Sequence, residues 1–285
     1  MTIEPIFGAD ANRLLTAVGQ LAGGHATLAF KAAENGHVVL MGYDEEALEQ
    51  KIGELRCTHK VEVTVGAPQV AYRETVAWST EVDHTHKKQT GGSGQFARVK
   101  LRIEPNGHGA GNEFESKVIG GAVPKECIRG VEKGVQGVWD AGVLIGFPMM
   151  DTKVTLLDGA YHEMDSSALA FEIAAGVAMK EGAEKAGVKL LEPIMVVEVV
   201  TPGDFVGRVV GDLNSRRGHI GSRETRDTAT VIRAHVPLAD LFGYPSNLRS
   251  ITNGLASHAV RFGRYAEAPR SNGPDDFRPA SAMRA

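Results

Sequence analysis

Apolar residues near the start of the chain alternate between helical spacing and strand spacing. Leu14, Val18 and Leu21 recur as on the buried face of a helix. Asn35–Gly36 separates two short apolar runs, which is a strong hairpin signal. The pattern therefore predicts, in order, a strand near Ile3 and Ile6, a helix from about Asp10, strands at 26–32 and 37–41, a helix from about Asp44 and a strand at 61–65.

The end of the chain, at about 193–268, repeats this order of elements. Val206, Val209 and Leu213 lie on one face of a predicted helix, and Gly218 is its expected cap. We interpret both segments as domains of one βαββαβ architecture. The elements predicted here are a strand at 194–201, a helix opening at Pro202 and Asp204, strands at about 219–226 and 229–237, a helix marked by Tyr244, Leu248 and Ile251, and a strand at 255–265.

The middle of the chain, at about 71–190, has a different order. A long Ala-rich helix is expected from about Asp165 to Ala186, with Leu169, Ile173 and Val177 facing inward. The other elements predicted here are strands at 72–81, 96–103, 113–119 and 154–157, a turn at 106–111 and a helix from Pro124 to Gly142.

Together these patterns predict an α+β fold of several domains. A chain of 285 residues is too long for one typical core and suits two or three domains. We place the domains at 1–70, 71–190 and 191–268. The remaining stretch, 269–285, contains Pro, Ser and Arg without a pattern, so we expect a disordered tail.

Composition is that of an ordinary globular protein, with 42% hydrophobic and 23% charged residues. No apolar stretch approaches the roughly 20 residues that a membrane helix needs, so no membrane is expected as a partner. The two cysteines, Cys57 and Cys127, are too few for a disulfide framework or a four-cysteine zinc site, and they fit a reducing cytoplasm. With a net charge of −4, any nucleic-acid contact must come from local basic patches.

Motifs for nucleotide binding are missing from the sequence. The Walker phosphate loop, G-x-x-x-x-G-K-[ST], occurs nowhere, so that route to binding GTP is absent. Gly107–Gly111 superficially resembles a dinucleotide loop, but no helix follows it, and a hairpin turn is the simpler interpretation. We therefore expect no cofactor in this chain and no enzymatic activity of the chain alone.

Candidate hydrolase and metal motifs are incomplete. His162 and the residue after it begin like a zinc-protease H-E-x-x-H motif, but Ser166 stands where the second histidine belongs. The stretch 91–95 lacks the final glycine of a G-x-S-x-G nucleophile elbow. His84 and His86 could be metal ligands, but we expect a solvated basic loop there. We assign no catalytic residue and no metal site.

Two segments retain features that point to RNA. The stretch from His84 to Gln95 is basic and Gly-rich. Its glycines permit close backbone approach, and Lys87 and Lys88 can meet phosphates, although a flexible loop is the plain alternative. The second segment, 161–167, precedes the long helix and contains three good helix N-caps. Capping does not explain an aromatic residue and a histidine at an exposed loop tip.

Both segments belong to a longer series of motifs that resembles the carboxy-terminal half of bacterial elongation factor G. The motifs occur in the family's order over about residues 60–268, and their length makes them highly specific. They are GAPQVAYRET at 66–75, QTGGSGQFA at 89–97, LDGAYHEMDSSALAF at 157–171, LEPIM at 191–195, GDLNSRRG at 211–218 and LFGYPSNLRS at 241–250.

The resemblance implies two ferredoxin-like βαββαβ domains, at 1–70 and 191–268, flanking a ribosomal protein S5 domain 2-like α/β domain at 71–190. They correspond to the family's third, fifth and fourth domains. In this family the fourth domain reaches the decoding region of the small ribosomal subunit, where its tip loops contact tRNA and mRNA during translocation. The fifth domain packs near the factor-binding region of the large subunit. The implied partners of this chain, expected to be a monomer, are thus the ribosome, tRNA and mRNA, whereas GTP and magnesium belong to the G domain that it lacks.

The resemblance also implies site residues, with His162 at the position of the family's tip histidine. The expected contacts to tRNA and mRNA are Gly91, Gly92, Ser93, Gly94, Gln95, Tyr161, His162, Asp165 and Ser166. The expected contacts to ribosomal RNA are Lys87, Lys88, Arg216, Arg217, Arg223 and Arg249.

One stretch departs from the family pattern, and three functions stay open. Residues 42–48, GYDEEAL, replace a Gly-x-Gly-Glu-Leu-His-Leu-like motif of the third domain, so the chain fits a divergent paralogue. Met1 falls where the family's third domain begins, so an excised fragment or a truncated gene is also expected to fit. The first function is the ribosome-binding part of elongation factor G, acting in translocation when joined to its GTPase domain. The second is part of a related translational GTPase for ribosome recycling or ribosomal protection. The third is an independent hydrolase using His162, Asp165 and Ser166.

Overall fold

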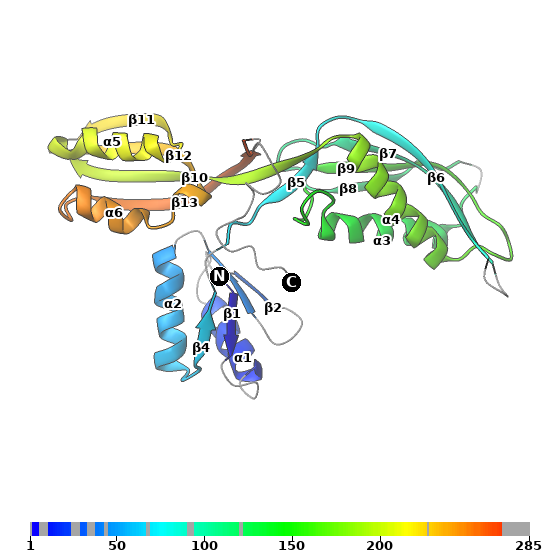
Figure 1. Ribbon diagram of the computed structural model, residues 1–285, viewed down its shortest axis with the longest axis horizontal. Coiled ribbons are helices and arrows are strands. Elements are labelled where there is room, and N and C mark those ends of the chain that lie inside the picture. The colour runs from blue at the N-terminus through cyan, green and yellow to red at the C-terminus, as the bar shows by residue number, and fades with distance from the viewer. Residues whose placement is uncertain are drawn as a thin grey trace. The chain divides into compact units, whose positions relative to one another are not determined.

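The computed structural model describes residues 2–5, 11–23, 29–32, 38–42, 45–66, 69–89, 94–119, 122–226 and 228–269 (Figure 1). They form a mixed α/β, multi-domain protein, which confirms the predicted fold class. The chain divides into two compact units. The first includes Met1–Val70 and Pro193–Arg264, and the second, here called the middle unit, includes Ala71–Glu192 and Tyr265–Pro269. Of the predicted tail, only Pro269 lies within the described residues.

The first sheet confirms the βαββαβ order predicted from the sequence. Its strands lie in the order β2-β3-β1-β4, and neighbouring strands are antiparallel. Leu14, Leu40 and Leu55 are buried in its core. The turn predicted at Asn35–Gly36 lies outside the described residues. The elements are β1 (Thr2–Pro5), α1 (Ala11–Gly23), β2 (Ala29–Ala32), β3 (Val38–Met41), α2 (Glu45–Thr58) and β4 (Val63–Val65).

The last sheet has the same architecture, in the order β11-β12-β10-β13. The strands predicted at 219–226 and 229–237 are confirmed. The first strand begins earlier than predicted, because residues 188–191 pair with β5 (Arg73–Val76) of the middle unit. The elements are β10 (Val188–Pro202), a 3₁₀ turn (Gly203–Phe205), α5 (Val206–Ser215), β11 (His219–Arg226), β12 (Ala229–Pro237), a 3₁₀ turn (Leu238–Asp240), α6 (Tyr244–Ile251) and β13 (Ser257–Glu267).

The end of α5 corrects one detail of the sequence analysis. The left-handed residue there is Arg217, with φ of 57°, and not the expected Gly218. Gly218 N–H donates to Leu213 O at 2.8 Å, and Arg217 N–H donates to Asn214 O at 3.2 Å, which is a Schellman ending. Glycine is still required at 218, because a Cβ atom there would lie 2.4 Å from Leu213 O.

The middle unit contains a four-stranded sheet in the order β6-β7-β9-β8, with α4 packed against β6 and β7 (Figure 1). The β8–β9 pair is parallel and the other two pairs are antiparallel. Leu101, Leu156 and Phe171 are buried in its core. Besides β5, its elements are β6 (Thr80–Lys88), β7 (Gln95–Pro105), β8 (Glu113–Ser116), α3 (Lys125–Ala141), β9 (Thr152–Ala160) and α4 (Ala168–Lys185).

The single strand predicted at 72–81 is wrong, because two strands occupy this stretch. The N–H groups of Ala77 and Trp78 donate to Ala186 O at 3.1 and 3.2 Å, which interrupts the strand between β5 and β6. As a result β5 pairs with β10, whereas β6 begins the sheet of the middle unit.

The solvated loop expected from His84 onward is also wrong. The strand β6 continues to Lys88, which pairs with Gln95 at the end of the β6–β7 ladder. Val82 is its only buried residue, so the strand shows little alternation of apolar and polar positions. Backbone pairing with β7, and not burial, holds this edge strand in place.

The buried face of α4 differs from the prediction. Leu169, Ile173 and Val177 do not face inward, since they are 57%, 38% and 37% exposed. The face that packs into the core is made largely of small residues. Its buried members are Ala170, Phe171, Ala174, Ala175, Ala178, Met179, Gly182 and Ala183.

Close packing between α3 and α4 explains this choice of face. A Cβ atom at Gly130 would lie 2.2 Å from Ala168 O, and one at Gly134 would lie 2.2 Å from Glu172 O. The two helix backbones therefore approach so closely that only small residues fit between them. Leu169, Ile173 and Val177 are left on the other side of α4, which the helical spacing alone could not reveal.

Candidate nucleic-acid interface

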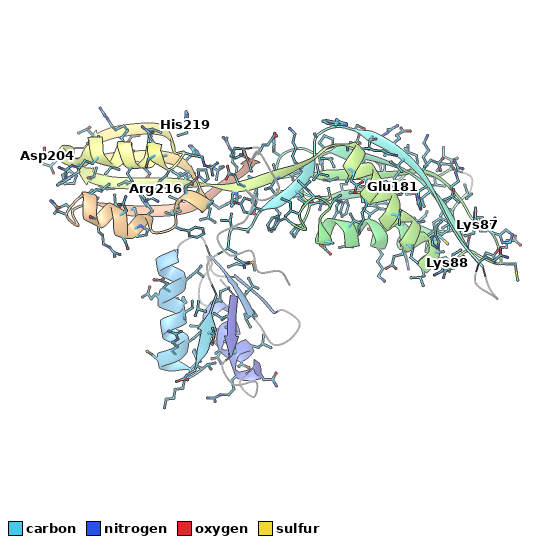
Figure 2. All side chains as sticks on the ribbon, viewed as in Figure 1. Lys87, Lys88, Glu181, Asp204, Arg216 and His219 are labelled. Carbon is cyan, nitrogen blue, oxygen red and sulfur yellow. The ribbon has the colours of Figure 1, made fainter. Side chains whose placement is uncertain are left out.

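The end of the β6–β7 hairpin carries two exposed lysines. Lys87 lies opposite Phe96 in the strand ladder, and Lys88 lies opposite Gln95, so neither lysine faces a carboxylate across the strands. Figure 2 shows both lysines at the end of β6. The charge at this end of the hairpin is therefore open to a polyanion such as RNA.

The glycine-rich turn of this hairpin is described only in part. The expected contacts Gly91, Gly92 and Ser93 lie outside the described residues. Gly94 directly precedes β7, and Gln95 Oε1 lies 3.1 Å from His86 Nε2 on the neighbouring strand. This contact across the strands holds the Gln95 side chain beside the last pairs of the ladder.

The loop between β9 and α4 is closed by its own hydrogen bonds. His162 O accepts from Asp165 N–H at 3.3 Å and from Ser166 N–H at 2.9 Å. Ser167 Oγ accepts from Ala170 N–H at 3.2 Å, which makes Ser167 the N-cap of α4. Of the three cap residues that the sequence offers, Asp165 and Ser166 are thereby left for other contacts.

Ser166 joins this loop to the hairpin. Its Oγ donates to Phe96 O at 2.6 Å and accepts from His162 N–H at 2.8 Å. Phe96 N–H in turn donates to Asp165 O at 2.9 Å. Both backbone polar groups of Phe96 therefore bond to the second loop, and two segments far apart in sequence form one surface. We call this surface the tip, made of residues 86–89, 94–96 and 161–167.

Gly94 shows how closely the two loops approach each other. A Cβ atom at this position would lie 2.8 Å from Asp165 Oδ1 and 2.9 Å from Asp165 Cγ. A larger residue at 94 would therefore displace the Asp165 carboxylate. The requirement for glycine is a matter of space, because the neighbouring loop occupies the place of a side chain.

His162 lies exposed at the tip, with 59% of its side chain accessible. Its Nδ1 is 3.4 Å from Asp165 Oδ2, which is a loose contact. Tyr161 and Met164 are also exposed, at 42% and 83%. Aromatic rings that can stack, a histidine that can hydrogen-bond and nearby lysines are the groups that proteins use to contact RNA bases and phosphates.

The same geometry argues against Ser166 as a nucleophile. An activated serine donates its hydroxyl proton to a base such as histidine. The Ser166 proton is instead directed to Phe96 O, and its oxygen accepts from the backbone N–H of His162. The hydroxyl is thus occupied by contacts that shape the loops.

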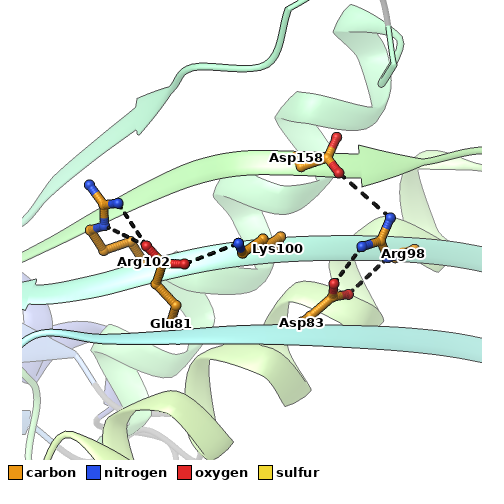
Figure 3. A network of polar contacts seen from close by, with 6 residues as sticks. All are labelled: Glu81, Asp83, Arg98, Lys100, Arg102 and Asp158. Carbon is orange, nitrogen blue, oxygen red and sulfur yellow. Dashed lines mark hydrogen bonds and ion pairs between the residues drawn. The ribbon is translucent and has the colours of Figure 1, made fainter.

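The solvent side of the β6–β7–β9 sheet carries a network of ion pairs (Figure 3). Arg102 Nε and Nη2 donate to Glu81 Oε1 at 3.1 and 2.7 Å, and Lys100 Nζ lies 3.1 Å from Glu81 Oε2. These hydrogen bonds, first from Arg102 and then from Lys100, hold the pKa of the Glu81 carboxyl below its ordinary value. Both cations are therefore paired with the same carboxylate.

Arg98 forms the other half of this network. Its guanidinium binds both carboxylate oxygens of Asp83, with Nε at 2.9 Å from Oδ1, and its Nη1 lies 3.6 Å from Asp158 Oδ2. The hydrogen bonds from Arg98 hold the pKa of Asp83 below its ordinary value. We call the six residues of the network the paired face: Glu81, Asp83, Arg98, Lys100, Arg102 and Asp158.

In the last domain, the Arg216 side chain is fixed by contacts with neighbouring residues. Its Nε lies 3.1 Å from Asp212 Oδ2, its Nη1 donates to Asp240 O at 2.7 Å, and its guanidinium lies 5.2 Å from the ring centre of Tyr244. Only 18% of the side chain is accessible. Burial also raises the pKa of Tyr244. The guanidinium therefore connects α5 to the start of α6 and offers little surface to a phosphate.

The other arginines expected to meet ribosomal RNA are more accessible. Arg217 is 43% exposed, and its Nε lies 2.8 Å from Asp240 Oδ2. Arg223 on β11 and Arg249 in the last turn of α6 are also exposed. Their side chains are accessible enough to reach a phosphate, and Arg217 would exchange its ion pair with Asp240 for that contact.

Candidate metal ligands are separated in the structure. In the part of the chain that the structure describes, no group of three or more His, Cys, Asp or Glu is placed to hold a metal ion. His84 Nδ1 lies 3.4 Å from Glu181 Oε1 on α4, and His86 lies beside Gln95. Across the same described residues, no helix has the length and apolar character needed to cross a membrane.

One organising residue, Glu74, was missed by the sequence analysis. It is fully buried, and its carboxylate accepts hydrogen bonds from the backbone N–H groups of the five residues 143–147, at 2.6 to 3.1 Å. Glu74 shares the inward face of β5 with Val76. The alternation of residues along β5 could have indicated that Glu74 faces inward. A buried glutamate in a short strand has no sequence motif of its own, however.

Two family models match this chain. The model described as "Elongation factor G, domain IV" matches residues 68–187, and the one described as "Elongation factor G C-terminus" matches 189–273. The first match contains both loops of the tip, and the second contains the last sheet.

Two relatives extend the likeness to most of the chain. The chain is 54% identical over 270 residues to elongation factor G of Rhodopseudomonas palustris (strain BisB18), covering 94% of the chain and 39% of that protein. It is 51% identical over 272 residues to elongation factor G of Paracoccus denitrificans (strain Pd 1222), covering 95% and 38%. The chain thus spans about two fifths of the length of these relatives.

A solved structure is also similar. A protein of Thermus thermophilus, known from a crystal structure, superposes with a TM-score of 0.75 at 37% sequence identity. The likeness covers 94% of this chain and 40% of that one. The folds of the domains described above are therefore shared with an experimentally determined structure.

Proposed function

Since the chain belongs to the elongation factor G family, whose fourth and carboxy-terminal domains it carries, we propose that it is the ribosome-binding part of a translocation factor. In this proposal the tip contacts tRNA and mRNA in the decoding region of the small ribosomal subunit. The protein promotes their movement when the chain is joined to a GTPase domain, which binds the GTP and magnesium. The action of the chain itself is steric and electrostatic.

The observation that carries the proposal is the joining of two loops around an exposed histidine. Ser166 bonds to both His162 and Phe96, so the start of β7 and the loop before α4 are joined by direct hydrogen bonds. A small, rigid surface of this kind suits the shallow minor groove of an RNA duplex, where a histidine can donate or accept a hydrogen bond.

Accessible arginines of the last domain support a second contact. Arg217, Arg223 and Arg249 are exposed and can meet phosphates of the factor-binding RNA of the large subunit. Arg216 has a structural role in the same region, because only 18% of its side chain is accessible and its guanidinium bonds to Asp212 and Asp240. We therefore assign the RNA contact of this domain to the three exposed arginines.

The test is a translocation assay with the gene product that contains this chain. The variant His162→Ala should slow mRNA movement on pre-translocation ribosomes about tenfold, which corresponds to the loss of about 1.4 kcal/mol in the transition state. Its rate of GTP hydrolysis should stay unchanged. His108→Ala, at an exposed histidine in the turn between β7 and β8, is the matched control and should behave as wild type. Movement at the wild-type rate with His162→Ala would contradict the proposal.

A binding assay tests the ribosome contact of the chain alone. The chain should sediment with 70S ribosomes at low salt and dissociate as salt rises, because contacts between basic side chains and phosphates release counterions. Failure to bind even at low salt and excess chain would count against the proposal. A gene product that splits ribosomes but does not move mRNA would point instead to a recycling factor.

A further inference from the structure

The paired face contains three carboxylates placed around three cations on the solvent side of the sheet. Going beyond the translocation proposal, we infer that Glu81, Asp83 and Asp158 are specificity residues, which prevent a row of basic side chains on β7 from binding RNA along the open side of the sheet. The paired face would thus confine RNA binding to the tip.

The basic row follows from the periodicity of β7. Arg98, Lys100 and Arg102 alternate with the buried Ala97, Val99, Leu101 and Ile103, so all three cations point to the solvent side. Alternate residues of a strand lie about 7 Å apart. Three cations in such a row on an open sheet form a phosphate-binding strip unless something neutralises them.

Neutralisation is complete within the network. Glu81 binds Lys100 and Arg102, while Asp83 and Asp158 flank Arg98 from the strands on either side (Figure 3). Asp83 accepts two hydrogen bonds from the Arg98 guanidinium. These bonds use the same pair of N–H donors that would bind a phosphate. An RNA phosphate would have to displace these carboxylates.

At the other end of β6, no carboxylate lies opposite the basic residues in the strand ladder. Lys87 and Lys88 continue the strand β6 beyond Glu81 and Asp83, and they lie opposite Phe96 and Gln95. The charge along β6 therefore changes from acidic beside the basic row to basic at Lys87 and Lys88, and the carboxylates of the tip, Glu163 and Asp165, belong to the other loop. This arrangement leaves the tip as the part of the hairpin that attracts RNA.

Stability alone is a weak explanation for the network. All six side chains are between 36% and 50% accessible. Exposed ion pairs contribute little to folding, because water and salt screen them. Suppression of unwanted binding is a stronger reason to place three carboxylates around three cations, since specificity requires that competing contacts be made unfavourable.

The test removes the negative charges and keeps the side-chain shapes. The triple variant E81Q/D83N/D158N of the whole chain is titrated with a short fluorescein-labelled RNA duplex, and anisotropy is recorded over a series of KCl concentrations. The variant should bind the duplex about tenfold more tightly at low salt. Its dependence of log K on log salt should steepen by about 2, because each added phosphate contact contributes about 0.7 to 0.9.

A matched control separates the local row from the change in net charge. The variant E132Q/D140N/E184Q removes three exposed carboxylates from α3 and α4, so its net charge changes by the same amount. It should bind the duplex much more weakly than the triple variant of the paired face. Equal gains in the two variants would overturn the inference.

A second set of variants tests the basic row directly. Adding R98Q/K100Q/R102Q to the triple variant should return binding to the wild-type level or below. Persistence of the tighter binding would overturn the inference, and so would wild-type affinity in a triple variant with a normal circular dichroism spectrum.

If the triple variant misfolds, Asp83→Asn alone should steepen the salt dependence of log K by about 0.7 to 0.9, and no steepening would overturn the inference. These assays contain no ribosome, so their outcome is independent of the translocation assay.

Discussion

In the middle unit, one buried and one half-buried side chain each bind backbone groups of a segment distant in sequence. Glu74 is fully buried and accepts the N–H groups of residues 143–147. Ser166 belongs to an exposed loop and bonds to His162 and Phe96. Removing a fully buried acceptor leaves a cavity and takes away the partner of several N–H groups at once, whereas water can replace a more accessible hydroxyl. The comparison teaches that Glu74 stabilises the fold, while Ser166 sets the shape of a surface.

The largest expected effect comes from removing the buried carboxylate. Glu74→Ala leaves five N–H groups without their acceptor and should lower the free energy of unfolding of the middle unit by about 3 kcal/mol or more. Hydrogen exchange of the amides at 143–147 should accelerate accordingly. Glu132→Ala, at an exposed position of α3, is the control and should change exchange little. Equal protection in the two variants would contradict the role of Glu74.

Removing the half-buried Ser166 hydroxyl should affect function more than stability. Ser166→Ala removes the bridge between the loops and should cost about 1 kcal/mol of stability or less. On the proposed function, translocation should slow about fivefold, because His162 is no longer held beside the hairpin. The measurement is the rate of mRNA movement with the gene product.

Ser167→Ala supplies the matched control for Ser166. Loss of the α4 N-cap should cost about 1 kcal/mol of stability, but the hydroxyl bridge stays intact. Translocation should therefore remain near the wild-type rate, and Ser166→Thr should recover part of the activity by restoring a hydroxyl. If Ser167→Ala slows translocation as much as Ser166→Ala, general destabilisation explains both, and the bridge has no special role.

A similar effect on the joined loops is expected at Gly94. Gly94→Ala brings a Cβ atom into the Asp165 carboxylate and should destabilise the tip by about 1 kcal/mol. Asp165→Ala should relieve this conflict, so a double-mutant cycle should show a coupling of at least about 0.5 kcal/mol. Independent effects of the two changes in thermal unfolding would mean that the loops do not meet as described.

The smallest expected effect is a loss of stability of the β6–β7 hairpin at low pH. Hydrogen bonds from Arg98 and from Arg102 hold the pKa of Asp83 and Glu81 below their ordinary values of 3.8 and 4.5. The contribution of these carboxylates is present above those values and is lost as pH falls through the lowered pKa. Exchange of the β6–β7 amides should therefore rise modestly below about pH 4, and less so in the E81Q/D83N variant. An identical acid response of the two proteins would contradict the pairing.

The sequence predicted the bounds of β12 because this strand has one buried face. In β12 every second residue is buried, and the predicted bounds match the structure. The same method failed at β6, where pairing with β7 replaces burial, and at α4. There the large residues Leu169 and Ile173 suggested the wrong face, because the inward face was determined by how closely α3 approaches. Both the extent of β6 and the buried face of α4 depend on packing partners that the local sequence pattern does not show.

The candidate site shows the same limit. The motifs identified both loops of the tip, but a capping residue looks the same in sequence whether it caps a helix or joins a loop. The structure distinguishes Ser167, which caps α4, from Ser166, which binds Phe96. Likewise Arg216 and Arg217 are neighbours in one motif, yet only Arg216 is largely buried. Burial depends on contacts with α6 that no local pattern encodes.

The central claim, that the two loops of the tip form a single RNA-contacting surface, is tested most directly by crosslinking on the ribosome. A photoreactive residue is placed at position 162 of the gene product and, as a control, at position 132 on α3. After binding to 70S ribosomes that carry mRNA and tRNA, the probe at 162 should crosslink to mRNA or tRNA, and the probe at 132 should not. Equal crosslinking from both positions, or none from 162 in ribosome-bound protein, would contradict the account.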